Sequence, residues 1–272
     1  MSYIVKKGIL KLLHLLLIVC CMMPLVGKSE NIISLFPRVR VVPDSILEKM
    51  YSSASIYSEE VKGYKANLYL KGTITVHKKN RIIKYVPSMF KLEDSISNYM
   101  HESISELKYT APAIYDRKIK AMVSTFRSQR GEMFDIMDYM KFNVYSSSLM
   151  GDKLLSPLNR QSKIHYKYML DSLSVINGKV ECKIIVVPRY KSTKLVEGYM
   201  WLSADDWSVN SFELEGAYDL VDFKIKANMG NTPQTKYLPC YMDLDMHFRF
   251  LKNHLQMRYS GWLDYTDVEF TR

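Results

Sequence analysis

The sequence predicts a mainly β fold of the α+β class, an antiparallel meander sheet with helices packed on one face. After Ile164 the chain alternates apolar and polar residues through seven segments that short turns connect. Before them, one amphipathic helical pattern leads into a long alternating segment. With 47% hydrophobic and 24% charged residues among 272, the composition excludes disorder, collagen and a coiled coil as descriptions of the whole chain.

The first 27 residues are expected to be a signal peptide and to lie outside the fold. Lysines are followed by the apolar run Leu12–Val26, and Gly27 offers the small residue that a signal peptidase needs. This run is shorter than the about 20 residues that span a bilayer, so cleavage is favoured over a retained anchor. Lipidation at Cys20 is the weaker alternative.

The charge balance argues against nucleic acid as a partner. Lys and Arg total 38 against 28 Asp and Glu, a formal charge of +10. The excess is not gathered into one region, since its densest group is the short run Lys78–Arg81, which is typical of a solvated loop. A weak attraction to anionic lipid head groups, and with it a peripheral membrane contact, stays open.

Two cysteines remain after removal of the leader, Cys182 and Cys240. Both are expected on the apolar side of alternating strands, which is typical of buried free thiols. A disulfide between them is the alternative, because the chain is expected in a compartment where disulfides persist.

The domain is expected to begin after an extended lead-in at 28–43 and to occupy 44–272 without a further boundary. A helix is predicted from Asp44 or Ser45, either of which is able to cap it, to about Glu60, with Gly63 closing it. Apolar residues recur there every three or four positions. The predicted buried face comprises Leu47, Met50, Tyr51, Ala54 and Tyr57.

Strands are predicted next at 65–76, with a return strand at 81–86, and then at 99–109 and 119–126. Helical spacing reappears at 132–142. The apolar face of that helix is predicted to comprise Met133, Ile136, Met137 and Met140.

The seven segments of the second half predict consecutive strands of an antiparallel meander. Asn177–Gly178 is a two-residue hairpin turn, because both residues adopt positive φ readily. Further turns are expected at Ala204–Asp206 and Lys252–Asn253. The seven predicted strands cover residues 164–171, 180–186, 196–202, 207–214, 221–227, 240–250 and 255–263.

Several phrases of the sequence, in their order, resemble a family of Gram-negative envelope proteins of unknown function, over about residues 60–268. These phrases are Tyr64–Gly72, Val86–Phe90, Leu155–Leu158, His165–Tyr168, Val187–Arg189 and Gly198–Trp207. Longer members resemble a three-part protein, with a carboxypeptidase-regulatory-like domain before this segment and an outer-membrane β-barrel after it. The resemblance supplies no catalytic residue.

The resemblance implies a curved half-barrel similar to that of outer-membrane lipoprotein carriers, in which a twisted sheet wraps helices and an apolar cavity. It also implies a location in the periplasm or at the periplasmic face of the outer membrane. Because only a short lead-in precedes Pro43 and the sequence stops at Arg272, a stand-alone or shortened periplasmic portion is expected.

Five aromatic residues are the candidate ligand site: Tyr166, Tyr168, Tyr199, Trp201 and Trp207. On one concave sheet face they would line a slot for an acyl chain or a peptide, because aromatic rings combine a large contact area with a polar tip. Cross-strand packing within an ordinary core is the alternative.

Asp243, Asp245 and His247 lie two residues apart, so on a strand they point to one face. Two carboxylates and an imidazole suit a divalent metal. The solvent-exposed face of an amphipathic strand needs polar residues in any case. A structural metal site also uses a fourth ligand, which this pattern does not supply. No metal site and no cofactor are therefore predicted.

These features predict a non-enzymatic binding or scaffold module of the cell envelope, with a lipid, a lipoprotein or an outer-membrane protein as its partner. A small outer-membrane β-barrel is one alternative, because strands of about ten residues alternate in the same way. The helical patterns and the final residues Glu269–Arg272, which do not end on an aromatic, speak against it.

An exported hydrolase is the other alternative. It would have to assemble from serines such as Ser146–Ser148 or Ser156 and from histidines such as His165 and His247. None of them lies in the Gly-x-Ser-x-Gly setting of a nucleophile elbow, so no catalytic residue is predicted.

Overall fold

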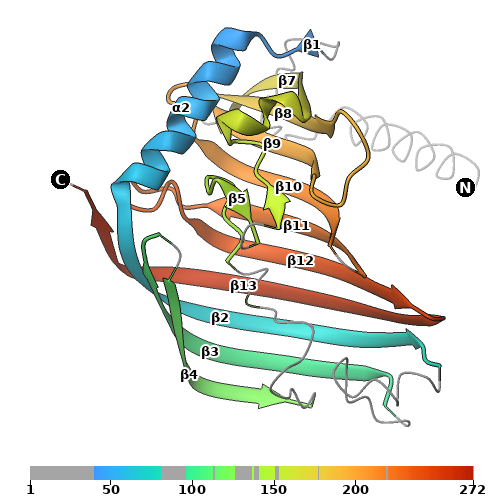
Figure 1. Cartoon of the computed structure of the whole chain (residues 1–272). Coiled ribbons are helices and arrows are strands. Elements are labelled where there is room, and N and C mark those ends of the chain that lie inside the picture. Colours follow the sequence, from blue (N-terminus) through green and yellow to red (C-terminus); the bar gives the residue numbers. More distant parts are fainter. Residues whose placement is uncertain are drawn as a thin grey trace, which may run out of the picture. The chain divides into compact units, whose positions relative to one another are not determined.

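An eleven-stranded antiparallel sheet organises the part of the chain that the structure, a computed structural model, describes (Figure 1). The described residues are 40–80, 96–112, 114–125, 137, 141–150, 153–176, 178–218 and 220–271. They lie in one compact unit, Ser34–Arg272. The predicted mainly β architecture is confirmed.

The seven-strand meander is also confirmed, because the strands of the second half lie side by side in chain order. They are β7 (Tyr166–Ile176), β8 (Lys179–Pro188), β9 (Glu197–Ser203), β10 (Val209–Tyr218), β11 (Val221–Met229), β12 (Pro239–Phe250) and β13 (Asn253–Phe270). Gly178, with φ of 78°, follows the end of β7 as the predicted hairpin turn requires.

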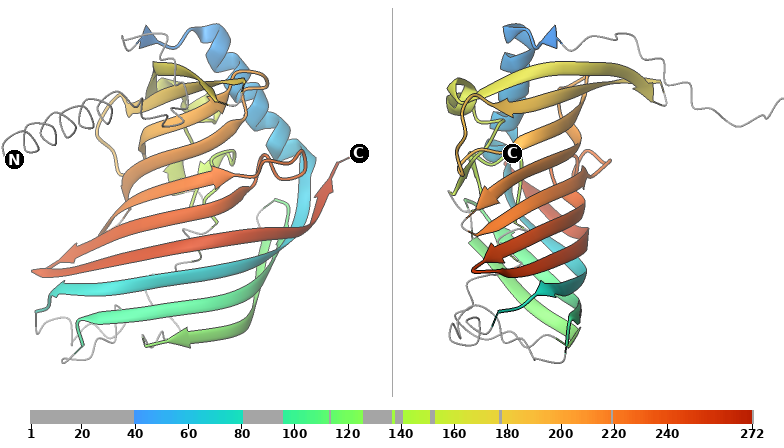
Figure 2. Two further views of the ribbon diagram at one scale, coloured as in Figure 1. Left: turned by 180° about the vertical axis from the view of Figure 1, so that it is seen from behind. Right: turned by 90° about the vertical axis from the view of Figure 1, so that its right-hand side faces the viewer.

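The sheet continues beyond β13 with strands from the first half of the chain. These are β2 (Val61–Lys78), β3 (Asn98–Thr110) and β4 (Ile114–Ser124), while the short β1 (Arg40–Val41) pairs with β7 at the opposite edge. The last strand of the chain is therefore a central strand, held by β12 on one side and by β2 on the other. Figure 2 shows the twist that accumulates across the strands.

Helix α2 (Asp44–Glu60) and residues 141–150 and 153–158 cover one face of the sheet, which we call the inner face. The predicted helix face is buried as expected, with Met50 and Tyr51 almost fully enclosed. Phe142 packs on Phe212 of β10, with ring centroids 5.6 Å apart. These covering residues also contain β5 (Ser148–Leu149) and β6 (Leu154–Leu155), and η2 (Arg160–Ile164) follows them.

Both ends of α2 differ from the prediction. Pro43 occupies the N-cap, and Asp44 is the first helical residue and makes no capping hydrogen bond. Gly63 does not close the helix, because the chain passes directly from Glu60 into β2, where Gly63 pairs with Thr110. The α2 helix is not long and apolar enough to cross a bilayer, and neither is any other helix of the described residues.

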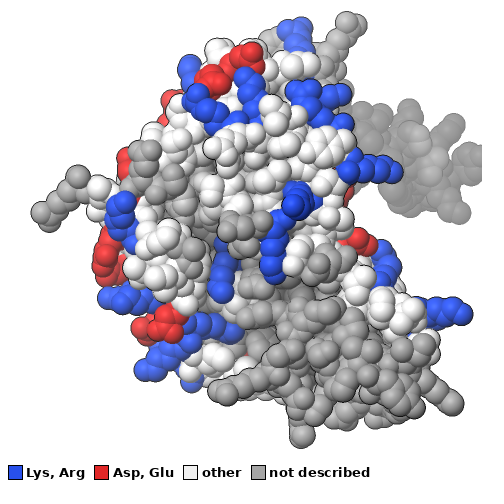
Figure 3. Space-filling model, viewed as in Figure 1, with Lys and Arg blue, Asp and Glu red and all other residues white. Residues whose placement is uncertain are grey.

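The opposite side of the sheet, the outer face, carries the polar half of each alternating strand. In β12, Met242, Leu244 and Met246 are buried on the inner face, whereas Asp243 and Asp245 lie on the outer face. Figure 3 views the molecule from the opposite, inner side, which α2 covers, and shows Lys and Arg scattered among the described residues of that side.

Three predicted boundaries are wrong. Ile164 belongs to the 3-10 turn η2 and is 72% exposed, so β7 begins only at Tyr166. Trp207 has φ of 61°, which a strand does not accommodate, and β10 begins at Val209. The turn before β13 consists of Leu251 and Lys252, and Asn253 is already paired in β13.

Other predictions have different outcomes. The strand predicted at 119–126 is β4, which starts earlier, at Ile114. The predicted strand at 81–86 and most of the predicted helix at 132–142 fall outside the described residues. Cys182 and Cys240 are both free, and Cys240 is only half-buried because the pairing of β11 with β12 shifts register beside it.

Replacing Leu251 and Lys252 with Asn and Gly is expected to raise the free energy of unfolding by about 1 kcal/mol. The two residues have φ of 46° and 65°, a type I′ geometry that Asn-Gly adopts with less strain. Urea denaturation followed by circular dichroism measures the change. A lower stability of the Leu251→Asn/Lys252→Gly variant would contradict this turn geometry.

Candidate binding groove

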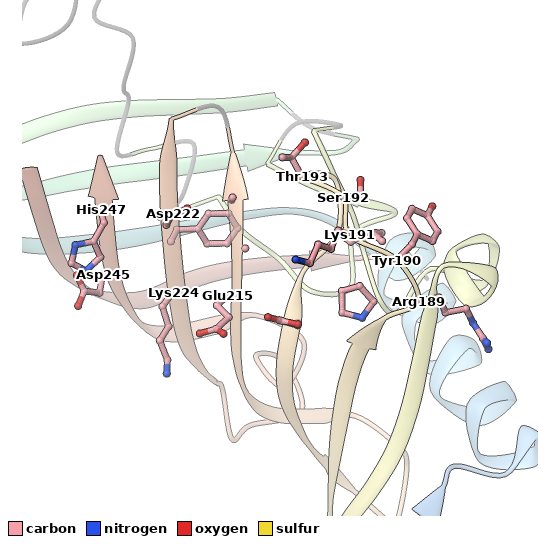
Figure 4. A pocket seen from close by; sticks show the side chains of 16 residues that line it. Arg189, Tyr190, Lys191, Ser192, Thr193, Glu215, Asp222, Lys224, Asp245 and His247 are labelled. Carbon is pink, nitrogen blue, oxygen red and sulfur yellow. Dashed lines mark ion pairs between the residues drawn. The ribbon is translucent and has the colours of Figure 1, made fainter. Parts of the chain in front are cut away.

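A groove of about 1000 Å³ opens at the end of the sheet where β10 extends beyond β9 (Figure 4). The pairing of β9 with β10 ends at Glu197 and Glu215, whereas β10 continues to pair with β11 as far as Tyr218. The loop 189–196 leaves the sheet at this point. Within the part of the chain that the structure describes, no strand therefore pairs with Gly216–Tyr218 on the side of β10 that faces β9.

The lining of the groove is mixed in polarity. Its loop wall consists of Pro188, Arg189, Tyr190, Lys191, Ser192, Thr193 and Leu195. The strands contribute Glu197, Glu215, Gly216, Ala217, Asp222, Phe223, Lys224, Asp245 and His247. The groove thus offers carboxylates, cations, hydroxyls and apolar surface within one hollow.

Tyr166 ties the loop wall to the sheet. Its buried hydroxyl donates to the carbonyl oxygen of Leu155 at 2.7 Å and accepts from the backbone N–H of Val196 at 3.2 Å. Burial raises the pKa of Tyr166 to about 12, so the hydroxyl keeps its proton and remains a donor at neutral pH. Arg189 adds a bond from Nε to the carbonyl oxygen of Tyr166 at 2.9 Å.

The carboxylates near the groove differ in their partners. Glu213, next to the groove in β10, forms ion pairs with Lys224 and with Lys226. Burial alone would raise the pKa of Glu213, but the hydrogen bonds and charges of these lysines lower it. Glu215 and Glu197 form no ion pair with any residue that the structure describes.

The far end of the groove is a hydrogen-bonded cluster. Asp245 accepts two bonds from Nε2 of Gln256, at 2.9 and 3.2 Å. Nδ1 of His247 lies 3.1 Å from Nε2 of His254, and the ring of His77 stacks on that of His254 at 4.7 Å. Asp245 and His247, two of the residues considered for a metal, are thus engaged by other side chains.

Asp243, the third member of the metal-ligand pattern, accepts a hydrogen bond from Oγ of Ser260 at 2.9 Å. Asp243, Asp245 and His247 do lie on the outer face together, as their spacing predicts. Within the described ranges, no three side chains of His, Cys, Asp or Glu are grouped so as to hold a metal ion.

Lowering the pH from 7.5 to 5.5 is expected to reduce the melting temperature, in part through His254. Burial lowers the pKa of His254 below its usual 6.5, and the nearby His77, Arg249 and His247 lower it further. Below pH 6.5 the unfolded chain therefore binds more protons at this residue than the folded chain, so stability falls until the pH passes the folded pKa.

The measurement is thermal unfolding at several pH values for the unmodified chain and for the His254→Asn variant. The variant should show a shallower dependence on pH, although His101, whose pKa is lowered by burial and by Arg117, should leave part of it. An unchanged pH dependence in the variant would rule out this role of His254.

The five predicted aromatic residues do not line one slot. Tyr166 and Tyr168 are buried on the inner face, where their hydroxyls donate to the carbonyl oxygens of Leu155 and Pro157. Tyr199 and Trp201 lie on the outer face, because Met200 and Leu202 take the buried positions of β9.

Lys183 covers both outer aromatic rings, with Nζ 4.2 Å from the ring of Tyr199 and 5.5 Å from that of Trp201. Trp207 lies apart from both pairs, in the turn before β10. It lines a small apolar pocket of about 210 Å³ between the start of α2 and strands β7 and β8. That pocket is lined by Val42, Ile46, Leu170, Leu173, Val180, Cys182, Ile184, Ala204 and Trp207.

The residues considered for hydrolysis serve other contacts. Oγ of Ser156 is buried, donates to the carbonyl oxygen of Val144 at 2.7 Å and accepts from the N–H of Leu158. Nδ1 of His165 lies 2.6 Å from the hydroxyl of Tyr190, and His247 contacts His254. These contacts join Ser156 to neither histidine.

Sequence reasoning missed the carboxylates of the groove, Glu197 and Glu215. Each lies on the polar side of an alternating strand, so the pattern gives them no special place. Their meeting depends on the register between β9 and β10, which the pattern does not contain. The nine residues that separate the strands predicted to end at 186 and to begin at 196 were the available signal of a loop.

Comparison with known proteins identifies a family whose model matches most of the chain. Residues 46–266 match the model of a family described as “Family of unknown function (DUF5686)”. No curated protein matches the chain.

Several solved structures align with the chain at low identity and low TM-score. A LolA superfamily protein from Nitrosomonas europaea aligns with 85% of this chain and 94% of its own, at 10% identity and a TM-score of 0.29. A putative outer membrane lipoprotein-sorting protein domain from Vibrio parahaemolyticus aligns with 84% of this chain and 93% of its own, at 11% identity and a TM-score of 0.29. A DUF1329 family protein from Desulfovibrio piger aligns with 84% of this chain and 92% of its own, at 9% identity and a TM-score of 0.31. These values assign no ligand.

Proposed function

The chain belongs to this family of unknown function, and from that premise we propose that it is a non-enzymatic binding module of the cell envelope. Its groove would hold an extended segment of a partner protein. The partner is expected to be a lipoprotein or an outer-membrane protein, and the location the periplasm or the periplasmic face of the outer membrane, because the leader pattern favours export.

The open side of β10 is the observation that carries the proposal. Gly216–Tyr218 pair with β11 on one side, and on the other side no strand of the described residues pairs with them, since β9 begins only at Glu197. An extended peptide satisfies such a strand by adding main-chain hydrogen bonds, while pockets for alternate side chains give specificity. The groove supplies both features in one place.

The size and lining of the groove point in the same direction. At about 1000 Å³ it lies at the upper end of the range of about 300 to 1000 Å³ for small-molecule sites. Its walls combine four carboxylates with three cations, His247, Phe223 and Leu195. Such a surface suits a chain of several residues with mixed side chains.

Photo-crosslinking in a Gram-negative host tests the proposal. A benzophenone amino acid at Thr193, in the loop wall, is expected to form a discrete adduct with one partner. The same amino acid at Lys179, at the other end of β8, is the matched control and should form none. Adducts that are equal at the two positions, or absent at Thr193, would contradict the proposal.

Binding of the purified chain to the identified partner completes the test. Ala217→Trp should abolish binding by filling the groove, whereas Lys179→Trp, which adds the same side chain elsewhere, should not. Equal affinities of the two variants would place the partner outside the groove.

A lipid is a second candidate ligand, favoured by the wholly apolar lining of the pocket beside Trp207. Its volume of about 210 Å³ is below the usual range of ligand pockets, so it would take only a short or partial acyl chain. A Trp201→Phe/Trp262→Phe variant keeps Trp207 as the one tryptophan, and brominated dodecanoic acid should quench its fluorescence. Quenching that persists after Ala204→Phe would contradict binding in this pocket.

A further inference from the structure

We propose that the groove selects a positively charged segment, with a Lys or Arg side chain of the partner lying between the carboxylates of Glu197 and Glu215. This inference rests on the proposed function and adds to it the charge of the partner.

Glu197 and Glu215 are directly opposite each other on neighbouring strands, at the last pair of the β9–β10 ladder. Like charges in this position repel each other across the 4.5–5.5 Å that separates opposite Cβ atoms. Both side chains are exposed and both line the groove. The position where β10 loses its neighbour therefore carries two negative charges.

Two neighbouring carboxylates of the outer face are arranged differently. Two residues earlier in β10, Glu213 lies between Lys224 and Lys226 and is paired with both. Farther along, Asp222 is paired with Arg249 at 2.8 Å. Against this pattern, neither Glu197 nor Glu215 forms an ion pair with a residue that the structure describes. Lys224, opposite Glu215, acts on it through its charge alone, so the carboxylate oxygens of both glutamates are left for a ligand.

The cations of the groove are directed elsewhere or lie on its loop wall. Lys224 is opposite Glu215 in the ladder but forms its ion pair with Glu213. Arg189 is tied through Nε to the carbonyl oxygen of Tyr166. Lys191 belongs to the loop and forms no ion pair with either glutamate. Figure 4 shows Lys191 on the loop and Glu215 beside Lys224 on the strands.

A second hollow of about 380 Å³ adjoins the same carboxylates. It shares Glu197, Glu215 and Lys224 with the groove and adds Ile185, Val187 and Tyr199. A long cationic side chain needs apolar surface for its stem and acceptors for its head. The two hollows place these features next to each other, and a guanidinium is able to bridge two carboxylates through its fork of donors.

Selection from a library of random dodecapeptides on the purified protein tests the inference without assuming a sequence. The recovered peptides are expected to be enriched in Lys or Arg. A Glu197→Gln/Glu215→Gln variant should bind them on the order of tenfold more weakly, because charge-assisted hydrogen bonds are lost. Their affinity for the unmodified protein should fall with added salt.

The matched control is Glu181→Gln/Asp264→Asn, which removes two negative charges from elsewhere on the outer face and should leave the affinity unchanged. Equal weakening in both variants would mean general attraction and would overturn the inference. Peptides that Ala217→Trp displaces but that carry no excess of Lys or Arg would overturn the inference and leave the proposed function standing. No peptide sensitive to Ala217→Trp would count against both.

Discussion

Gly198→Ala is expected to lower the free energy of unfolding by about 3 kcal/mol or more. Gly198 has φ of 142°, a conformation that side chains other than glycine rarely adopt. A Cβ at this position would also overlap the carbonyl oxygen of Glu213 in the facing strand β10. The strand pair must then separate beside the groove. Urea denaturation followed by circular dichroism measures the loss.

Gly178→Ala separates the two causes of that loss. Gly178 also has positive φ, at 78°, but a Cβ there would meet no atom within 4 Å. Only the backbone strain remains, so the expected loss is about 1 kcal/mol. Equal losses at the two glycines would show that contact with β10 is not what Gly198 avoids.

Tyr166→Phe is expected to lower the free energy of unfolding by about 2–3 kcal/mol. The substitution leaves the carbonyl oxygen of Leu155 and the N–H of Val196 without their buried partner. Because Val196 ends the loop wall of the groove, its amide should also exchange hydrogen faster. Chemical denaturation and hydrogen exchange measure the two effects.

Tyr190→Phe is the matched control for Tyr166→Phe. Its hydroxyl contacts Nδ1 of His165, but the side chain is 51% exposed, so water replaces the bond. The expected loss is about 0.5 kcal/mol or less. A loss at Tyr166 no larger than at Tyr190 would mean that the buried hydroxyl does not hold the loop.

The sequence was sufficient for features that depend on residues close together in the chain. The alternation of Met242, Leu244 and Met246 with Asp243 and Asp245 defines both faces of β12, because successive side chains of a strand point to opposite sides. The face of α2 follows in the same way from helical spacing. These patterns show which side chains of an element are buried, and for β12 and α2 that prediction is correct.

The sequence contains no comparable pattern that shows which distant segments pair with each other. Nothing in the alternation of β2 indicates that its neighbour is β13, more than half of the chain away, because any strand with one buried face satisfies the same requirement. The groove could not be predicted from the sequence for the same reason, because it depends on where β9 starts relative to β10. The aromatic residues were misplaced because Tyr199 and Trp201 have the opposite parity to Met200 and Leu202.

The central position of the last strand has a consequence for how the molecule is made. During synthesis, β2, β3 and β4 emerge first, and β2 has an open edge until β13 is complete. In the described sheet, β13 alone joins the two halves, so the sheet is complete only after residues 253–270 have been made. Loss of residues 253–271 would therefore divide the sheet into two separate ribbons, each with a long exposed edge.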